Sequence, residues 1–164
     1  TAPAAEDVPV DVGAVVERVE HMLSPLARAV EVSLELKLQP GCVVLATEDD
    51  LYQIAFNLME NAVKYNLPGG RVLVTLTADG GRVVLRVEDT GVGIPKADLP
   101  KIFDRFYRVD KARSRAAGGT GLGLSIVRDT VLQHGGAVTA RRREPEGTCF
   151  EVSFAQWNGE EVGR

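Results

Sequence analysis

Apolar residues recur with two different periods along this chain, and the periods separate the expected helices from the expected strands. After a small, polar stretch over residues 1–9, Asp11 can cap a helix whose apolar positions return every three to four residues. Similar reasoning predicts helices over residues 48–65, 97–107 and 120–133. The positions of the first helix that we expect to face the core are Val12, Val15, Val16, Val19, Met22 and Leu23.

Alternation of apolar and polar residues predicts strands, most clearly over residues 30–38. A short strand at 42–45 and a hairpin around Asp79-Gly80-Gly81, a tight-turn sequence, come next, and two last strands are expected at 138–142 and 148–154. Because hairpins are mixed with helices, this order indicates an α+β fold. We expect a two-layer sandwich with helices on one face of a mixed, mostly antiparallel sheet.

Length and composition favour one globular domain, since 164 residues with 45% hydrophobic and 26% charged side chains can bury a core. We assign residues 1–10 to a linker remnant, 11–155 to the domain and 156–164 to a C-terminal tail. The net charge of −4 disfavours nucleic acid as a partner. Cys42 and Cys149 indicate no disulfide framework or metal cluster, which fits a reducing, cytosolic compartment.

The expected helix over residues 51–65 carries the first candidate chemistry. At about 100° per residue, Asn57, Asn61 and Lys64 fall within an arc of roughly 60° beside the apolar stripe. The amide oxygen of Asn61 suits Mg²⁺, which prefers hard oxygen ligands, and Lys64 would meet phosphates. A solvated helix face explains the same pattern, and this helix alone favours that simpler interpretation.

Asp89 ends its predicted strand on the apolar side, because Val83, Leu85 and Val87 point the same way. A carboxylate there is costly unless a donor meets it, and the exocyclic amine of adenine is such a donor. Asp89 can equally cap the turn that it forms with Thr90 and Gly91. The strand pattern by itself favours neither interpretation.

Two glycine loops, at residues 91–93 and 118–124, follow this strand. The second runs into an expected helix, so free N–H groups and the positive helix end can receive phosphate there. Neither loop matches the P-loop or a clean dinucleotide-binding pattern, which disfavours both. Five cations between the loops indicate either a solvated loop or a lid that closes over a triphosphate. They are Arg105, Arg108, Lys111, Arg113 and Arg115.

The remaining titratable residues assemble no second centre. His21 is interpreted as a helix-surface residue, and His134 as a cation or cap at a helix end. No Ser-His-Asp set, Cys-His set or metal-spaced cluster of Cys and His can be built from the sequence.

The order of these motifs resembles the catalytic domain of bacterial sensor histidine kinases. Residues 57–65 (NLMENAVKY) resemble the N box of that family, and residues 89–94 (DTGVGI) resemble its G1 box. Residues 102–108 (IFDRFYR) resemble the F box and residues 119–124 (GTGLGL) the G2 box, while Gly147-Thr148 resembles the final glycine-threonine element. The match runs from about residue 11 to residue 154, and four boxes in the family's order argue strongly against a chance match.

The resemblance implies a Bergerat-type fold, shared with DNA gyrase and Hsp90, and a site for ATP and Mg²⁺. It implies that Asn61 binds Mg²⁺ and that Asn57 and Lys64 bind the phosphates and act in catalysis. Arg105 or another lid arginine would reach the γ-phosphate, and Asp89 would read the adenine amine. The other cofactor-binding residues that it implies are Tyr65, Gly91, Gly93, Ile94, Gly119, Thr120, Gly121, Leu122, Gly123, Leu124 and, through water, Thr148.

Position 57 separates the branches of this family, since hydrolysing relatives place there a glutamate that activates water. The Asn57 amide cannot act as a base, so we expect phosphoryl transfer to a histidine, with an ATPase or a nucleotide-sensing module as alternatives.

The phosphoacceptor box of the family is absent from this sequence, which begins at Thr1 and which we expect to be a piece of a longer chain. The expected partners are therefore the dimerisation and phosphoacceptor domain of the same kinase and a response regulator reached through the phosphohistidine. We expect this piece to be monomeric, and the full-length kinase to be a membrane-anchored homodimer with this domain in the cytoplasm.

Overall fold

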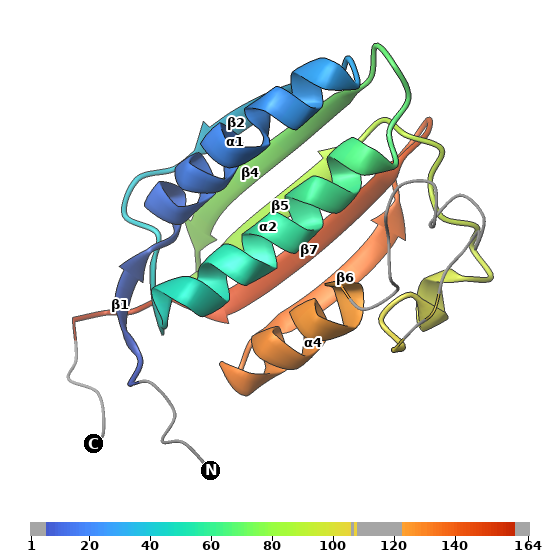
Figure 1. Cartoon of the computed structure of the whole chain (residues 1–164). Helices are drawn as coiled ribbons and strands as arrows, with labels where there is room; N and C mark the ends of the chain where they lie inside the picture. Colours follow the sequence, from blue (N-terminus) through green and yellow to red (C-terminus); the bar gives the residue numbers. More distant parts are fainter. Residues whose placement is uncertain (1–5, 106, 108–122, 160–164) are drawn as a thin grey trace.

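A five-stranded sheet backed by a layer of helices forms the frame of the computed structural model, which describes residues 6–105, 107 and 123–159 (Figure 1). The strand order is β2-β4-β5-β7-β6, in which β2 and β4 are parallel and the other neighbours antiparallel. The predicted mixed sheet with helices on one face is thereby confirmed. The strands are β2 (Ser33–Leu38), β4 (Arg71–Asp79), β5 (Arg82–Asp89), β6 (Ala137–Arg142) and β7 (Thr148–Ala155).

Side-chain caps fix where the two longer helices begin. Asp11 caps α1 (Val12–Ala29) by accepting the N–H of Gly13 at 3.0 Å. Thr47 caps α2 (Glu48–Lys64) by accepting the N–H of Asp50 at 3.1 Å. Three acidic residues in the first turn stabilise the helix further, because their negative charges lie at the positive end of its dipole. Helix α4 spans Gly123–Gln133. None of the helices within the described ranges is long and apolar enough to cross a bilayer.

The apolar stripe of α1 is narrower than the sequence predicts. Val19, Leu23 and Ala27 are buried at successive steps of four residues, whereas Met22 is 61% exposed. Because each residue turns the helix by about 100°, that stripe leaves Met22 on the solvent side, and its assignment to the core is wrong. The centre of the core lies between α2 and the sheet, where Ile54, Leu58, Met59, Val74, Val87 and Phe150 are almost fully buried.

The start and the end of the chain contribute more structure than a linker and a tail. Strand β1 (Val8–Asp11) pairs antiparallel with β3 (Val43–Ala46), so residues 8–10 belong to the folded domain and not to the linker. Pro9 and a length of four residues weaken the strand pattern there. At the other end, the N–H groups of Gln156 and Trp157 donate to Gly81 and Val43, which secures the beginning of the tail.

The prediction of a helix over residues 97–107 is wrong. Among the described residues of this range, 97–105 and 107, one 3₁₀ turn, η1 (Leu99–Lys101), is followed by turns and no α-helix is present. Pro100 lacks an N–H donor, and the apolar residues of this segment pack on the sheet instead of forming a helix face. Ile102 is buried, and the ring of Phe103 meets that of Phe150 edge-on at 6.2 Å.

His134 has a larger role in packing than its position at a helix end suggests. Its side chain is only 3% exposed, and it bridges two carboxylates that come from different parts of the chain. Its Nε2 lies 2.8 Å from Asp50 at the start of α2, and its Nδ1 lies 3.3 Å from Asp7 before β1. The imidazole therefore joins α4 to α2 and to the beginning of the folded chain.

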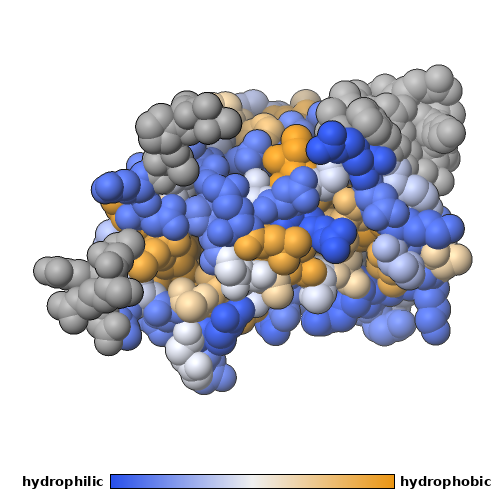
Figure 2. Space-filling view, turned by 90° about the horizontal axis from the view of Figure 1, so that it is seen from below, coloured by the Kyte–Doolittle hydropathy of each residue, from blue (hydrophilic) through white to orange (hydrophobic). Residues whose placement is uncertain are grey.

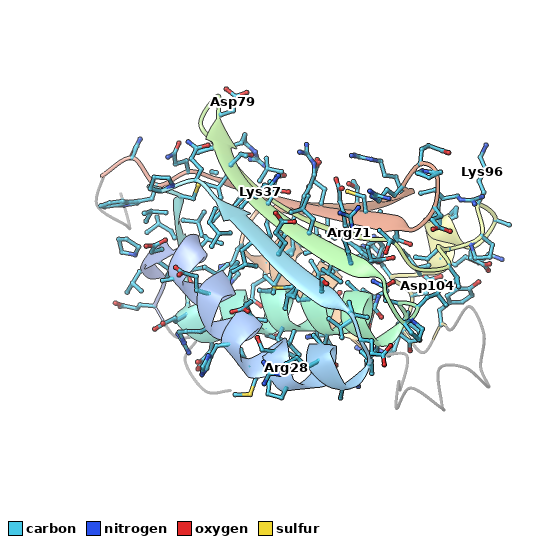
Figure 3. All side chains as sticks on the ribbon, turned by 90° about the horizontal axis from the view of Figure 1, so that it is seen from above. Arg28, Lys37, Arg71, Asp79, Lys96 and Asp104 are labelled. Carbon is cyan, nitrogen blue, oxygen red and sulfur yellow. The ribbon has the colours of Figure 1, made fainter. Side chains whose placement is uncertain are left out.

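Two further views show how polar groups cover the surface. Seen from below, apolar side chains appear in several separate groups between polar ones (Figure 2). From above, charged side chains stand over the sheet, with Arg71 and Asp79 at opposite ends of β4 (Figure 3). Isolated exposed apolar residues are normal for a soluble domain and indicate no broad apolar patch on the face in Figure 2.

Candidate functional site

Asp89 lies at the end of β5 and points into the core side of the sheet, with only 8% of the residue exposed. Its Oδ1 accepts the N–H of Gly91 at 2.9 Å. The turn-capping interpretation is therefore confirmed, and the carboxylate faces inward as the strand alternation predicts, while recognition of the adenine amine stays a prediction. A carboxylate has about four lone-pair directions, so capacity is left for another donor.

The electrostatics of this carboxylate are unusual. Burial raises the pKa of Asp89 to about 6, although the backbone N–H groups of Gly91 and Thr148 and the nearby charge of Arg143 each lower it. The group is thus ionised at neutral pH but held in an environment that disfavours its charge. A ligand donor that meets it would be bound strongly, which makes Asp89 a candidate for ligand recognition.

Three glycines allow the backbone to close around Asp89. A Cβ on Gly91 would lie 2.7 Å from the carbonyl oxygen of Tyr65, at the end of α2. A Cβ on Gly147 would lie 1.8 Å from the carbonyl oxygen of Asp89, and one on Gly93 would lie 3.2 Å from that of Gly147. The end of α2, the loop after β5 and the turn before β7 therefore meet at one place.

The polar face of α2 borders the start of α4. Asn57 donates from Nδ2 to the carbonyl oxygen of Gln53 at 2.9 Å, and a Cβ on Gly123 would lie 3.3 Å from its Oδ1. The amide oxygen of Asn57 thus faces the first residue of α4. Asn61 lies one turn further along α2 and Lys64 about two turns further, and both are partly exposed. The Nζ of Lys64 lies 3.6 Å from Oε1 of Glu60.

The donors present fit a metal ion that is shared with a ligand. Within the described residues, no group of three or more His, Cys, Asp or Glu side chains could hold a metal ion. Asn61, a partly exposed residue, has one amide oxygen that could serve as a ligand. Mg²⁺ usually takes one or two protein oxygens and completes its shell with phosphates and water, so this donor set fits Mg²⁺ only together with a phosphate ligand.

The other predicted site residues fall into two groups. Ile94 is half-buried against the core, Leu124 lies in the first turn of α4, and Thr148 is buried opposite Asp89 in the sheet. Arg105 is exposed after η1. Gly119, Thr120, Gly121 and Leu122 lie outside the described residues, as do Arg108, Lys111, Arg113 and Arg115.

Asn66 and Arg143 also lie at this end of the domain, and neither was expected there from the sequence. Asn66 donates from Nδ2 to the carbonyl oxygen of Arg71 at 3.0 Å, and the hydroxyl of Thr90 lies 3.5 Å from its Oδ1. It therefore ties the end of α2 to the start of β4 and to the loop that follows Asp89. An asparagine directly before Leu-Pro-Gly-Gly is a turn signal that could have been noticed. The role of Arg143 depends on strand register, which the sequence does not display.

An α+β sandwich, a buried aspartate at the end of β5 and two amides on the polar face of α2 are the features expected of an ATP-binding catalytic domain. The chain belongs to the family described as histidine kinase-, DNA gyrase B-, and HSP90-like ATPase, whose family model matches residues 46–157. Its relatives include sensor histidine kinases, and the resemblance seen in the sequence is thereby confirmed.

Two curated relatives and two solved structures give the extent of this similarity. RppB of Synechocystis sp., a sensor histidine kinase, is 40% identical over 130 residues, which are 79% of this chain and 29% of RppB. The sensor-like kinase SenX3 of Mycolicibacterium smegmatis is 36% identical over 148 residues, which are 90% of this chain and 38% of SenX3. The chain therefore spans well under half the length of either relative.

The solved structures agree over nearly the whole domain. The mycobacterial sensor histidine kinase MprB gives a TM-score of 0.77 at 32% identity, covering 92% of this chain and 97% of that chain. Full-length ShkA, solved in complex with AMPPNP, gives a TM-score of 0.81 at 33% identity, covering 97% of this chain and 33% of that chain.

Proposed function

We propose that this chain binds Mg²⁺–ATP and transfers the γ-phosphoryl group to a histidine on a separate domain, as the catalytic part of a sensor histidine kinase. The observation that carries the proposal is the buried, charged Asp89 beside the end of α2. The family and the sensor kinases among its relatives support it, as does the nucleotide analogue in the structure of the similar ShkA.

Each end of the nucleotide has its own residues in this proposal. The adenine amine donates to Asp89, with Thr148 acting through water and with Tyr65 and Ile94 lining the base. The triphosphate meets Asn57, Lys64 and the glycines at the start of α4, and Arg105 or a neighbouring arginine reaches the γ-phosphate. Asn61 holds Mg²⁺, which when bound neutralises part of the phosphate charge.

The amide at position 57 favours transfer over hydrolysis. Its Nδ2 is engaged by the carbonyl oxygen of Gln53, so its oxygen is the group turned toward the ligand side. An amide oxygen has no useful basicity near neutral pH and cannot take a proton from water. Phosphoryl transfer depends mainly on positioning and on charge neutralisation, which this set of residues can supply.

The phosphoacceptor is proposed to come from the dimerisation domain of the same kinase, with a response regulator as the next recipient of the phosphoryl group. The structure of the histidine kinase ThkA with the response regulator TrrA supports a partner of this kind. In this proposal the full-length kinase is a homodimer anchored in the cell membrane with this domain in the cytoplasm, and the isolated chain is a monomer.

The test is to mix this chain with a histidine-bearing helical acceptor domain and ATP labelled at the γ-phosphate. We expect the label to appear on the acceptor but not on an acceptor whose histidine is replaced by glutamine. Release of inorganic phosphate without transfer would instead identify an ATPase. Binding of ATP with neither outcome would identify a nucleotide-sensing module.

The affinity for ATP is expected to fall as the pH drops through about 6. The reason is that Asp89, whose pKa is raised to about 6, is protonated there, so its two oxygens can no longer both accept, one from the N–H of Gly91 and the other from the adenine amine. Calorimetry between pH 5 and 8 measures the effect. The phosphates of ATP titrate in the same range, so the quantity to plot is the affinity ratio between the parent and Asp89→Asn. A ratio that stays constant with pH would exclude titration of Asp89 as the cause.

A further inference from the structure

The turn between β6 and β7 is attached to the end of β5 by one arginine. Arg143 Nε lies 3.6 Å from Glu88 Oε2, and its Nη1 donates to the carbonyl oxygen of Glu146 at 3.2 Å. Its own N–H donates to the carbonyl oxygen of Gly147 at 2.9 Å. A single residue thus closes the turn internally and joins it to the strand that carries Asp89.

This turn forms one wall around Asp89. Gly147 is packed so closely that a Cβ on it would overlap the carbonyl oxygen of Asp89, and Thr148 is the cross-strand partner of Asp89. The N–H of Thr148 is also one of the groups that lower the pKa of the Asp89 carboxyl. A displacement of the turn would therefore move a donor that helps to keep this carboxylate charged.

The Arg143 side chain lies on the face of the sheet opposite to the helices, whereas the Asp89 carboxylate lies on the helix side. Glu88 and Asp89 are consecutive residues of β5, so their side chains point to opposite faces of the sheet. By pairing with Glu88, Arg143 approaches Asp89 from the helix-free face, and its positive charge still lowers the pKa of Asp89. Other charged or titratable groups lie on the elements around this end. They include Arg71 on β4, Arg141 and Arg142 on β6, Glu144 and Glu146 in the turn, Cys149 beside Glu88, and the Glu60–Lys64 pair on α2.

We infer that Arg143 is a positioning residue for adenine recognition, which holds the β6–β7 turn against Asp89 through its contacts with Glu88 and with the turn. The inference rests on the proposed function. An ordinary surface ion pair is the alternative, because the side chains of Arg143 and Glu88 are 28% and 26% exposed and pairs of this kind contribute little on their own. A positioning residue should affect ligand binding, whereas an ordinary surface ion pair should not.

The experiment measures ADP affinity between pH 5 and 8 for the parent and three variants. Arg143→Gln removes the charge, and Arg143→Lys keeps it without the guanidinium fork. Arg141→Gln is the matched control, since Arg141 is 60% exposed, lies two residues earlier on β6 and pairs with Glu151 at 3.9 Å. Thermal unfolding of each variant establishes that it is folded.

We expect Arg143→Gln to bind about fivefold more weakly at pH 6.5, with its loss of affinity on acidification displaced to higher pH. Arg143→Lys should restore the pH dependence of the parent, and Arg141→Gln should match the parent throughout. If the parent binds no ADP, the proposed function fails. If the parent binds ADP but both glutamine variants follow its curve, the inference about Arg143 fails alone. Should Arg143→Gln not fold, a displaced pH curve in Arg143→Lys would also overturn the inference.

Discussion

Asp89→Asn is expected to weaken ATP binding by about 100-fold while making the unliganded protein more stable. In the parent, one carboxylate oxygen accepts the N–H of Gly91, and in the proposed function the other accepts from the adenine amine. An asparagine must turn its NH₂ group toward one of these two donors, so one hydrogen bond is replaced by a repulsive donor–donor contact. The loss of a charged, buried hydrogen bond corresponds to about 2–3 kcal/mol, hence the factor of about 100.

The gain in stability follows from the pKa of Asp89. Because the folded pKa of about 6 lies above the ordinary value of 3.8, ionisation is harder in the folded protein than in the unfolded chain. The carboxylate therefore destabilises the fold above pH 6, by about 3 kcal/mol at most, and this cost disappears as the pH falls from 6 toward 4. A neutral asparagine avoids this cost, so the melting temperature of the Asp89→Asn variant should exceed that of the parent at pH 7.5.

Calorimetry with ATP and GTP, together with thermal unfolding, separates these effects. Asp79→Asn is the control, since Asp79 is exposed at the far end of β4 while the register places Asp89 beside Val72 at the near end (Figure 3). It should leave both affinity and stability unchanged. Equal affinities of the parent for ATP and GTP would show that Asp89 does not read the base.

Local periodicity was sufficient to predict most of the fold. The alternation along β5 correctly placed Asp89 on the buried side, because a strand has a strict period of two once its neighbours are paired. The same logic located α2 and the face that carries Asn57 and Asn61. The fold class and the burial of Asp89 therefore followed from short-range patterns that the tertiary structure preserves, whereas the base-reading role of Asp89 rests on the family resemblance and stays a prediction.

The errors arose where tertiary packing overrides local pattern. The segment around Phe103 has apolar residues at helical spacing, but their contacts with Phe150 and the presence of Pro100 replace the helix by a single turn. The link from Arg143 to Glu88 joins residues 55 positions apart and depends on the β5–β7–β6 register. Strand register is a long-range property, so no local signal predicts this contact.

Gly147→Ala is the substitution from which we expect the largest loss of stability, about 3 kcal/mol or more. Gly147 has a φ of 103°, and an added Cβ would lie 1.8 Å from the carbonyl oxygen of Asp89. The positive φ alone costs an alanine about 1 kcal/mol, and the overlap with a backbone atom cannot be relieved by rotating a side chain. Urea unfolding at neutral pH measures the change.

Gly135→Ala separates the two contributions, because Gly135 also has a positive φ, 72°, but has nothing within 4 Å of an added Cβ. The free energy of unfolding of Gly135→Ala should fall only by the cost of the positive φ, about 1 kcal/mol, and its ATP affinity should equal that of the parent. If the turn in Gly147→Ala moves away to relieve the overlap, stability returns but Thr148 is displaced from Asp89, so affinity must fall instead. A Gly147→Ala variant with both the stability and the ATP affinity of the parent would contradict the close packing of this turn and its role in positioning Asp89.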